Sequence, residues 1–335
     1  MEQQGNRYRV GVLGGGSWAT AIVKMLSNNH ETVNWWIRSA ASVEHLQKYG
    51  HNPKYITSIA FDMNRVKVTT DMQAVIDASD IVVLAIPSAF LDETMKSIRP
   101  TGLDQKIIFS AIKGIITQYD AIPARYLHKE FRTPYERIGI VAGPCHAEEV
   151  ASEKLSYLTL ACPDLDIAAV MAESLQCRYI KTSISEDVFG TEISAVLKNV
   201  YALAAGICHG LGYGDNFQSV LISNAIQEIQ RFVDRVHEVH RDVKSSAYLG
   251  DLLVTAYSPH SRNRAFGMMV GKGYGVRGAM MEMNMVAEGY YAAKGINAMN
   301  QRFQVDIPIA DAVYRILYEK AGPAIEMRLL ADRLA

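Results

Sequence analysis

The sequence predicts an α/β protein in which a doubly wound, mostly parallel β-sheet is followed by a mostly α-helical domain. Short apolar runs alternate with helix-forming segments from Arg9 to about Lys181, as in parallel sheets with crossover helices. From Asp187 onward the pattern is helical, without a convincing further strand. A chain of 335 residues, 49% of them hydrophobic, is long enough for two domains. We therefore expect domains at 1–186 and 187–335.

The predicted strands are short, and Ile81–Ile86 is apolar throughout, as expected of a parallel strand buried on both faces. In chain order the predicted strands cover 9–13, 32–37, 66–69, 81–86, 106–110, 138–142, 157–161 and 178–181. The predicted helices cover 17–27, 41–57 (ending in a turn at Asn52–Pro53), 72–78, 90–98, 167–175, 187–208, 216–239, 249–256, 279–294 and 309–318.

A glycine-rich turn joins the first strand to the first helix. Gly14 tolerates a positive φ, Gly16 lacks a Cβ and lets a pyrophosphate approach the backbone, and Ala19 allows close packing of helix and strand. The free N–H groups at the helix start would hold the phosphates. Because a strand precedes and a helix follows, the turn predicts a Rossmann-type, dinucleotide-binding domain rather than a plain structural turn.

The end of the second strand bears on the choice of nicotinamide cofactor. An acidic residue there would bind the ribose 2′-hydroxyl of NAD, and an arginine suits the 2′-phosphate of NADP. The sequence offers Arg38 and no Asp or Glu, which favours NADP over NAD. The alternative is that Arg38 stacks on the adenine ring, which would suit either cofactor.

Ligands of doubly wound sheets bind at the carboxyl ends of the strands. The glycine turn, Pro87, Lys113 and Gly143 all follow predicted strands, so we expect them to line one cleft. Lys113 could orient a substrate oxygen there, although a loop lysine is usually only solvated.

Lys198 is the most informative residue of the second half, because it lies in a helix that is apolar nearly all round. Burial would lower its pKa toward the range useful for proton transfer, unless its amine reaches water along the helix surface. Neighbouring Asn199 is a second polar group that needs a partner. Asp251, which follows Gly250, could pair with the buried lysine.

The segment Ser261–Arg262–Asn263 offers hydroxyl, guanidinium and amide donors in a row, a set suited to an anion. Turn and helix-cap roles are the alternative for Ser261 and Asn263.

Composition excludes several classes of protein. The net charge of −1 gives no reason to expect nucleic acid, and no apolar run reaches the roughly 18 residues of a membrane span. The polar N-terminus lacks a signal peptide, so a cytoplasmic protein is expected.

The four cysteines have no metal-ligand spacing, and we expect no bound metal. The methionines at 280, 281, 283 and 285 would fill core or interface gaps, which is compatible with a homodimer.

Five motifs occur in an order that resembles the bacterial type of the NAD(P)-dependent glycerol-3-phosphate dehydrogenase family. Beyond the glycine turn they are Ser110–Gly114, Ala142–Pro144, Leu197–Ala202, Gly250–Leu252 and Ser261–Arg264, and the likeness extends to Tyr314. The resemblance implies reduction of dihydroxyacetone phosphate, a small phosphorylated substrate, to sn-glycerol 3-phosphate with NADPH or NADH, for glycerophospholipid synthesis. It implies no metal.

The resemblance also implies roles for individual residues. Lys198 would be the catalytic proton donor and acceptor, with Asp251 and Lys113 supporting it. The implied substrate-binding residues are Lys113, Gly143, Cys145, Lys198, Asp251, Ser261, Arg262 and Asn263. The implied cofactor-binding residues, together with Gly14 and Gly16 of the turn, are Ser17, Trp18, Arg38, Lys113, Ala147, Arg262, Val286 and Glu288.

The chain departs from the family pattern at three places. Ala19 stands where the family often has glycine, Cys145–His146 where it has serine and an aromatic residue, and Ser223–Asn224–Ala225 where it has Thr-Arg-Gly. Two alternative functions follow if the resemblance misleads: another lysine-dependent two-domain hydroxy-acid dehydrogenase, or an NADP-binding regulator without turnover.

Overall fold

A computed structural model describes residues 8–99, 102–283 and 287–334. The chain forms two compact units. The first holds the residues up to Ile86 together with Phe90–Ile112 and Pro123–Val188, and the second holds Pro87–Ala89, Lys113–Ile122 and the chain from Phe189 onward. Two short segments that follow β-strands therefore group with the C-terminal unit. Their position in the sequence alone does not reveal that these two segments belong to the C-terminal unit. The division of function between residues 1–186 and 187–335 stays a prediction.

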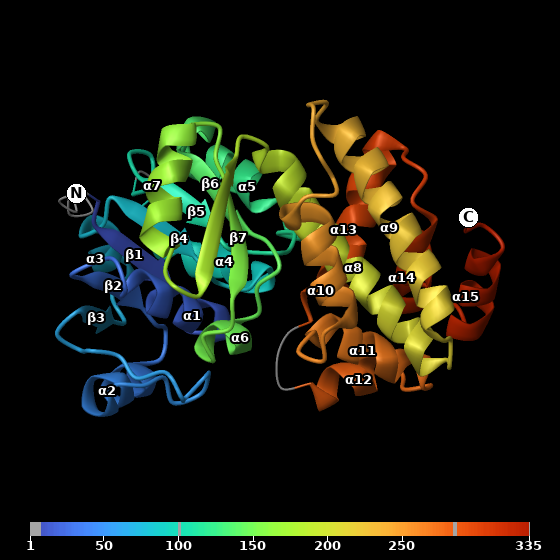
Figure 1. Cartoon of the computed structure of the whole chain (residues 1–335), viewed down its shortest axis with the longest axis horizontal. Helices are drawn as coiled ribbons and strands as arrows, with labels where there is room; N and C mark the ends of the chain where they lie inside the picture. Colours follow the sequence, from blue (N-terminus) through green and yellow to red (C-terminus); the bar gives the residue numbers. More distant parts are fainter. Residues whose placement is uncertain (1–7, 100–101, 284–286, 335) are drawn as a thin grey trace. The chain divides into compact units, whose positions relative to one another are not determined.

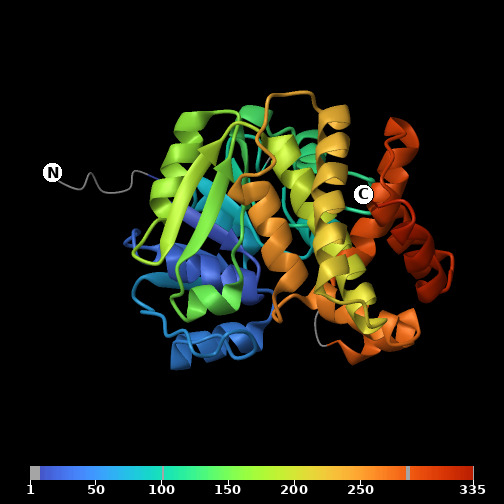
Figure 2. The same ribbon diagram turned by 45° about the vertical axis from the view of Figure 1, so that its right-hand side comes forward.

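The first unit contains an eight-stranded sheet with the order β3-β2-β1-β4-β5-β6-β7-β8 (Figure 1). All neighbouring strands are parallel except β6 and β7, which confirms a doubly wound, mostly parallel sheet. The strands are β1 (Val10–Leu13), β2 (Val33–Trp36), β3 (Val66–Thr69), β4 (Ile81–Leu84), β5 (Ile107–Ser110), β6 (Ile138–Ala142), β7 (Ser156–Ala161) and β8 (Ile180–Ser185). Figure 2 shows β7 and β8 side by side.

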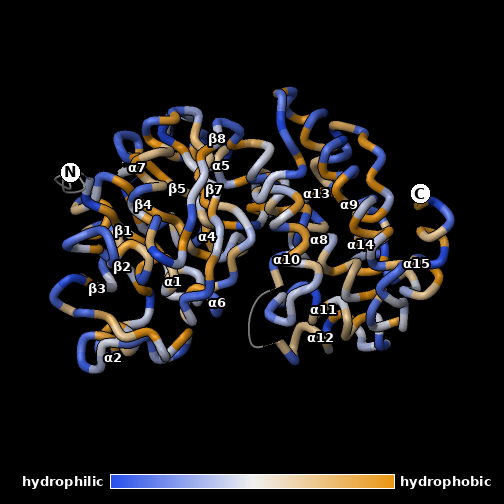
Figure 3. Tube along the Cα trace, in the orientation of Figure 1, coloured by the Kyte–Doolittle hydropathy of each residue, from blue (hydrophilic) through white to orange (hydrophobic). Residues whose placement is uncertain are grey.

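Helices connect these strands. They are α1 (Ser17–Leu26), α2 (Ala40–Tyr49), α3 (Met72–Asp77), α4 (Ser88–Met95), α5 (Pro123–Phe131), α6 (Ala147–Ala151) and α7 (Leu165–Leu175), with a short 3₁₀ turn η1 (Tyr135–Arg137). Side chains of Ser39, Asp71 and Asp164 cap α2, α3 and α7. The central strands β1 and β4 are buried on both faces, which explains their continuous apolar sequences. Hydrophobic colour accordingly follows the central strands in Figure 3.

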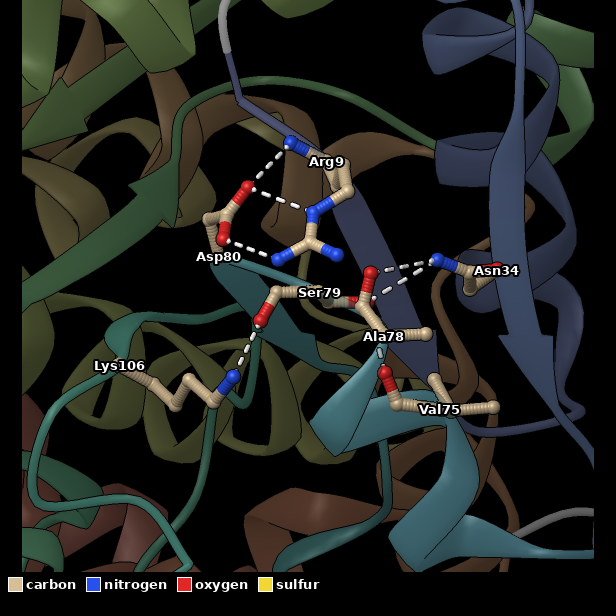
Figure 4. Close-up of polar contacts among 7 residues, drawn as sticks. All are labelled: Arg9, Asn34, Val75, Ala78, Ser79, Asp80 and Lys106. Carbon is tan, nitrogen blue, oxygen red and sulfur yellow. Dashed lines mark hydrogen bonds and ion pairs between the residues drawn. The ribbon is translucent and has the colours of Figure 1, made fainter.

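Polar contacts stabilise the amino-terminal edge of the sheet (Figure 4). Arg9 forms an ion pair with Asp80 at 2.7 Å, and its hydrogen bonds lower the pKa of that carboxyl to about 2. Asn34 donates its amide to Ala78 O and Ser79 Oγ at 3.4 and 3.2 Å. These residues satisfy backbone and side-chain groups at the edge opposite to the glycine turn.

The second unit is helical, and no strand occurs among its described residues, as predicted. Its helices are α8 (Val188–Gly210), α9 (Asp215–Val236), the π-helical turn η2 (Ser246–Gly250), α10 (Asp251–Tyr257), α11 (Arg262–Gly271), α12 (Val276–Glu282), α13 (Glu288–Phe303), α14 (Pro308–Tyr318) and α15 (Pro323–Ala331). Every residue of α8 from Gly190 to Cys208 is buried, so α8 is the central helix of this unit.

Helices α8 and α11 are packed so closely that their backbones are in contact. A Cβ on Gly206 of α8 would lie 2.1 Å from Arg264 O, and one on Gly267 of α11 would lie 2.2 Å from Leu203 O. No side chain fits at these positions without moving one helix away from the other. The small residues therefore hold the start of α11, and with it Asn263, beside α8.

The prediction of one continuous helix over 279–294 is wrong, because two helices cover this region. Helix α12 ends at Glu282, Met283 and Ala287 have extended backbones, and α13 begins at Glu288. The start of α13 is held by a tertiary hydrogen bond from Gly289 N to Asn263 Oδ1 at 2.9 Å. Helical periodicity cannot reveal such a contact.

The last strand also differs in position from the prediction, since β8 covers 180–185 instead of 178–181.

Substitution of Gly267 by alanine should destabilise the helical unit by about 1–3 kcal/mol, because the added methyl group collides with the α8 backbone. The matched control is Gly278→Ala in α12, where nothing lies within 4 Å of an added Cβ. Urea unfolding of both variants checks this expectation. Equal stability of the two variants would contradict it.

Candidate active site

The glycine turn of the first unit has the geometry of a phosphate-binding loop. Gly14 has φ +140°, and a Cβ there would lie 2.3 Å from Ala85 O. Around Gly16 nothing lies within 4 Å of an added Cβ, so this face of the turn is open. Gly16 is the N-cap of α1, and no side chain caps that helix. A dinucleotide pyrophosphate fits this open helix start.

Three other predicted cofactor residues of this unit, Ser17, Trp18 and Arg38, follow the turn in sequence. Ser17 and Trp18 are half-buried in the first turn of α1, and Ala19 is buried, as its packing role requires. Arg38 is exposed just after β2. It is therefore accessible to a ribose phosphate.

A second turn of this unit follows β6. Gly143 has φ +112°, and a Cβ there would lie 2.8 Å from Tyr157 O, so glycine is required. Cys145 is buried, and Ala147 is the buried first residue of α6. Cys145 and His146 thus lie between β6 and α6, at the carboxyl end of a parallel strand.

The predicted catalytic residues come together in the helical unit. Lys198 of α8 forms a close ion pair with Oδ1 of Asp251, the first residue of α10, and both side chains are almost fully buried. Lys113 Nζ lies 3.2 Å from Asp251 Oδ2 and is partly exposed. One carboxylate therefore holds two amines from segments 85 residues apart in sequence.

The turn η2 directly precedes Asp251, and π-helical turns are frequent at functional sites. Thr255 Oγ donates to Asp251 O at 2.6 Å and fixes the first turn of α10. The sequence predicted a helix here but not the wider π-helical turn.

Burial and charge shift the pKa values of this cluster in opposite directions. Burial lowers the pKa of Lys198 to about 7, although the Asp251 carboxylate acts to raise it, and the Lys113 ammonium lowers it further. Burial acts to raise the pKa of Asp251, but the ammonium groups of Lys113 and Lys198 outweigh it and keep that pKa below its usual value. Lys198 can therefore exchange a proton near neutral pH while Asp251 stays ionised.

Two asparagines connect Lys113 to the start of α13. Asn199 donates to Lys113 O at 2.7 Å, and Asn263 donates to Asn199 Oδ1 at 2.9 Å. Asn263 Oδ1 in turn accepts from Gly289 N. The sequence marked Asn199 as a polar group in need of a partner, and these contacts identify the partner.

Glu288 lies beside these asparagines at the start of α13. Its carboxylate accepts from Ser88 N at 3.0 Å and from Ser88 Oγ at 2.5 Å. Burial raises the pKa of Glu288, while the Ser88 hydrogen bonds and the Arg262 charge lower it. A Cβ on Gly114 would lie 2.4 Å from both groups, so glycine is needed there. Sequence analysis missed Ser88, whose one signal was its place after Pro87 at the end of a strand.

The remaining predicted residues have the following places. Ser261 is the N-cap of α11 and accepts from Arg264 N at 3.2 Å, the helix-cap role considered above. Arg262 is exposed in the first turn of α11. Val286 lies outside the described residues. Asn224, where the family has arginine, donates to Val220 O on its own helix at 2.9 Å.

Removal of the Asp251 carboxylate by Asp251→Ala should destabilise the protein by about 3 kcal/mol near pH 6, because two ammonium groups lose their shared partner. Without the carboxylate the pKa of Lys198 falls further below its unfolded value. The deficit should therefore shrink above about pH 7, where Lys198 is neutral in both proteins.

The control for this prediction is the double variant Lys198→Met/Asp251→Ala, which removes the buried amine as well and should regain much of the stability. Urea unfolding at pH 6 and pH 9 measures both variants. A deficit that is the same at the two pH values would contradict the proposed charge pairing.

A doubly wound sheet with a glycine turn, joined to a helical unit with a buried lysine–aspartate pair, is the architecture of two-domain nicotinamide-dependent dehydrogenases. Comparison with known proteins specifies the family. Profiles described as NAD-dependent glycerol-3-phosphate dehydrogenase N-terminus and C-terminus match residues 9–168 and 187–327. The chain therefore belongs to the NAD-dependent glycerol-3-phosphate dehydrogenase family, as the sequence motifs indicated.

Individual relatives agree with this assignment. The chain is 32% identical over 312 residues to a glycerol-3-phosphate dehydrogenase [NAD(P)+] of Macrococcus caseolyticus, covering 93% of this chain and 94% of that protein. It is 33% identical over 330 residues to the protein of that name from Limosilactobacillus reuteri, with 97% of each chain covered. The crystal structure of glycerol-3-phosphate dehydrogenase from Coxiella burnetii superposes with a TM-score of 0.89 at 26% identity, covering 97% of this chain and 98% of that chain.

Proposed function

We propose that the protein reduces dihydroxyacetone phosphate to sn-glycerol 3-phosphate, reversibly and with NADPH or NADH, for glycerophospholipid synthesis. The observation that carries the proposal is the buried Lys198–Asp251 pair with Lys113 beside it, in a chain of this family. The pair provides an amine that can gain or lose a proton near neutral pH.

The reaction adds a hydride to C2 of the substrate and a proton to its oxygen. When bound, NAD(P)H supplies the hydride. Lys198 Nζ donates the proton to the oxygen as negative charge develops on it, and in the reverse direction the neutral amine accepts that proton. Asp251 orients the amine, and Lys113 adds positive charge at the carbonyl end.

Binding of the phosphate is assigned to the start of α11, where Arg262 and Asn263 offer donors and Ser261 fixes the turn. This anchor uses binding energy remote from C2 to position the reacting carbon. Gly143 and Cys145 complete the proposed substrate-binding set. Residues 1–186 are proposed to bind the cofactor and 187–335 to carry the proton chemistry.

The proposed cofactor-binding residues of the first unit are Gly14, Gly16, Ser17, Trp18, Arg38 and Ala147, and those of the second unit are Lys113, Arg262 and Glu288. Gly16 supports this assignment, because its open face leaves room for a pyrophosphate.

Among the described residues no helix is long and apolar enough to cross a membrane. We further propose a cytoplasmic enzyme. Its net charge of −1 supports the proposal that it binds no nucleic acid. Exposed Met281 and half-buried Met283 support the proposal of a homodimer.

The first test mixes the purified protein with dihydroxyacetone phosphate and either NADPH or NADH and follows the loss of reduced-cofactor absorbance. Turnover with either cofactor supports the proposed reaction. Cofactor binding without turnover would overturn it, and a panel of 2-keto acids would then test for another hydroxy-acid dehydrogenase.

Replacement of Lys198 by methionine should lower kcat at least 100-fold, because the oxygen of the substrate loses its proton donor. The control is Lys294→Met on α13, whose exposed lysine should be dispensable. Steady-state kinetics on both variants checks this. Full activity of the Lys198 variant would remove Lys198 from the mechanism.

The pH dependence should differ between the two directions. Reduction needs the Lys198 ammonium, so its kcat/KM should fall as pH rises through about 7, and oxidation needs the neutral amine, so its kcat/KM should rise through the same range. Asp251→Asn should move the inflection to lower pH, because the carboxylate raises the pKa of Lys198. An inflection that stays in place would contradict this role of Asp251.

The NADPH preference that we propose depends on Arg38. Arg38→Ala should raise the Kd for NADPH about tenfold and leave that for NADH nearly unchanged, because only NADPH carries the 2′-phosphate. Fluorescence titration with the two cofactors measures both constants. An equal loss for both cofactors would indicate stacking on the adenine ring instead.

A further inference from the structure

Side chains hold all three carbonyl groups of the glycine turn. Trp35 Nε1 donates to Gly14 O at 2.6 Å, and Thr20 Oγ donates to Gly16 O at 2.9 Å. The middle carbonyl, of Gly15, accepts from Asn52 Nδ2 at 3.1 Å. Thr20 lies one turn further along α1, so its bond is local. Trp35 of β2 and Asn52 of the segment after α2 come from other elements, so tertiary contacts fix the carbonyls of Gly14 and Gly15.

Asn52 makes four hydrogen bonds in this network. Besides Gly15 O, its amide donates to Thr20 Oγ at 2.9 Å. Its Oδ1 accepts from Lys54 N at 3.0 Å and from Tyr55 N at 3.2 Å. The side chain is 2% exposed, so each donor and acceptor is satisfied without much solvent. One half of the amide therefore holds the turn, and the other half holds its own loop.

Fixing a carbonyl also fixes the N–H of the next residue. In a planar trans peptide the C=O and the following N–H point in opposite directions. The donors on the carbonyls of Gly14, Gly15 and Gly16 therefore direct the N–H groups of Gly15, Gly16 and Ser17 away from these three donors. An added Cβ on Gly16 would meet no atom within 4 Å, so a ligand can approach the turn there.

We propose that Asn52 is a positioning residue for the dinucleotide: it orients the Gly15–Gly16 peptide so that the N–H of Gly16 is presented to the pyrophosphate before the cofactor binds. This inference rests on the proposed cofactor site at the glycine turn. Asn52 acts through the backbone and touches neither the cofactor nor the reacting carbon. Its effect therefore falls on cofactor affinity, and the chemical step at saturating cofactor depends on other residues.

The test variant is Asn52→Asp, which keeps the acceptor for Lys54 N and Tyr55 N and replaces only the donor half of the side chain. An ionised oxygen then faces Gly15 O, and the turn loses its preferred orientation. The Kd for NADPH, measured by fluorescence titration, should rise at least tenfold. The KM for dihydroxyacetone phosphate and kcat at saturating NADPH should change less than threefold.

Asn34→Asp is the matched control. The Asn34 amide also donates to one backbone carbonyl and one hydroxyl, Ala78 O and Ser79 Oγ, but at the opposite edge of the sheet (Figure 4). The Asn34→Asp substitution should lower the Tm without changing the Kd for NADPH. A comparable drop in Tm in both variants, with a change in Kd in only one, separates positioning from general destabilisation.

Trp35→Phe provides a second probe that keeps an aromatic ring in the core and removes the donor to Gly14 O. It should raise the Kd in the same direction, and it keeps the inference testable if Asn52→Asp does not fold. If wild-type protein binds NADPH and both folded variants bind it equally well, the inference is overturned. If the wild type binds neither NADPH nor NADH, the proposed function fails first.

Discussion

The buried ion pair between Lys198 and Asp251 is the constraint on which the helical unit depends. An ammonium group inside an apolar helix is costly unless a carboxylate reaches it, and Asp251 supplies that carboxylate from the end of a π-helical turn. The same carboxylate also binds Lys113, which comes from a segment after β5. One acidic side chain thus fixes the positions of two amines and keeps one of them ready to exchange a proton near pH 7.

Polar side chains that satisfy the starts of other helices hold this unit together. Asn263 binds the first turn of α13, and Glu228 of α9 accepts from Ile309 N and Ala310 N at the start of α14. Both contacts satisfy N–H groups that a helix leaves without an internal partner. Burial raises the pKa of Glu228 to about 8, so this cap is sensitive to pH. Asn199 and Asn263 of the candidate active site belong to the same framework, because they bind each other and the start of α13.

The two proposed ligand-binding regions depend on different kinds of group. In the first unit the proposed binding groups are backbone N–H groups of the glycine turn, whose carbonyls accept from donors such as Trp35 and Asn52. In the second unit the proposed binding groups are charged side chains, whose protonation depends on burial and on one another. Glycines are required in both. At Gly14 and Gly143 they permit a positive φ, and at Gly206 and Gly267 they permit backbone contact between helices.

The sequence by itself determined the class of fold, the succession of most strands and helices along the chain, and most residues of the proposed catalytic cluster. Apolar runs with the period and length of buried strands, the glycine turn and a lysine in an apolar helix can each be recognised from neighbouring residues in the sequence. Only the tertiary structure decided the break between α12 and α13, the π-helical turn before Asp251, the grouping of Lys113 and Ser88 with the helical unit, and the hydrogen bond from Asn52 to the glycine turn. Each of these depends on a hydrogen bond or packing contact between residues distant in sequence, and such contacts leave no periodic pattern in the chain.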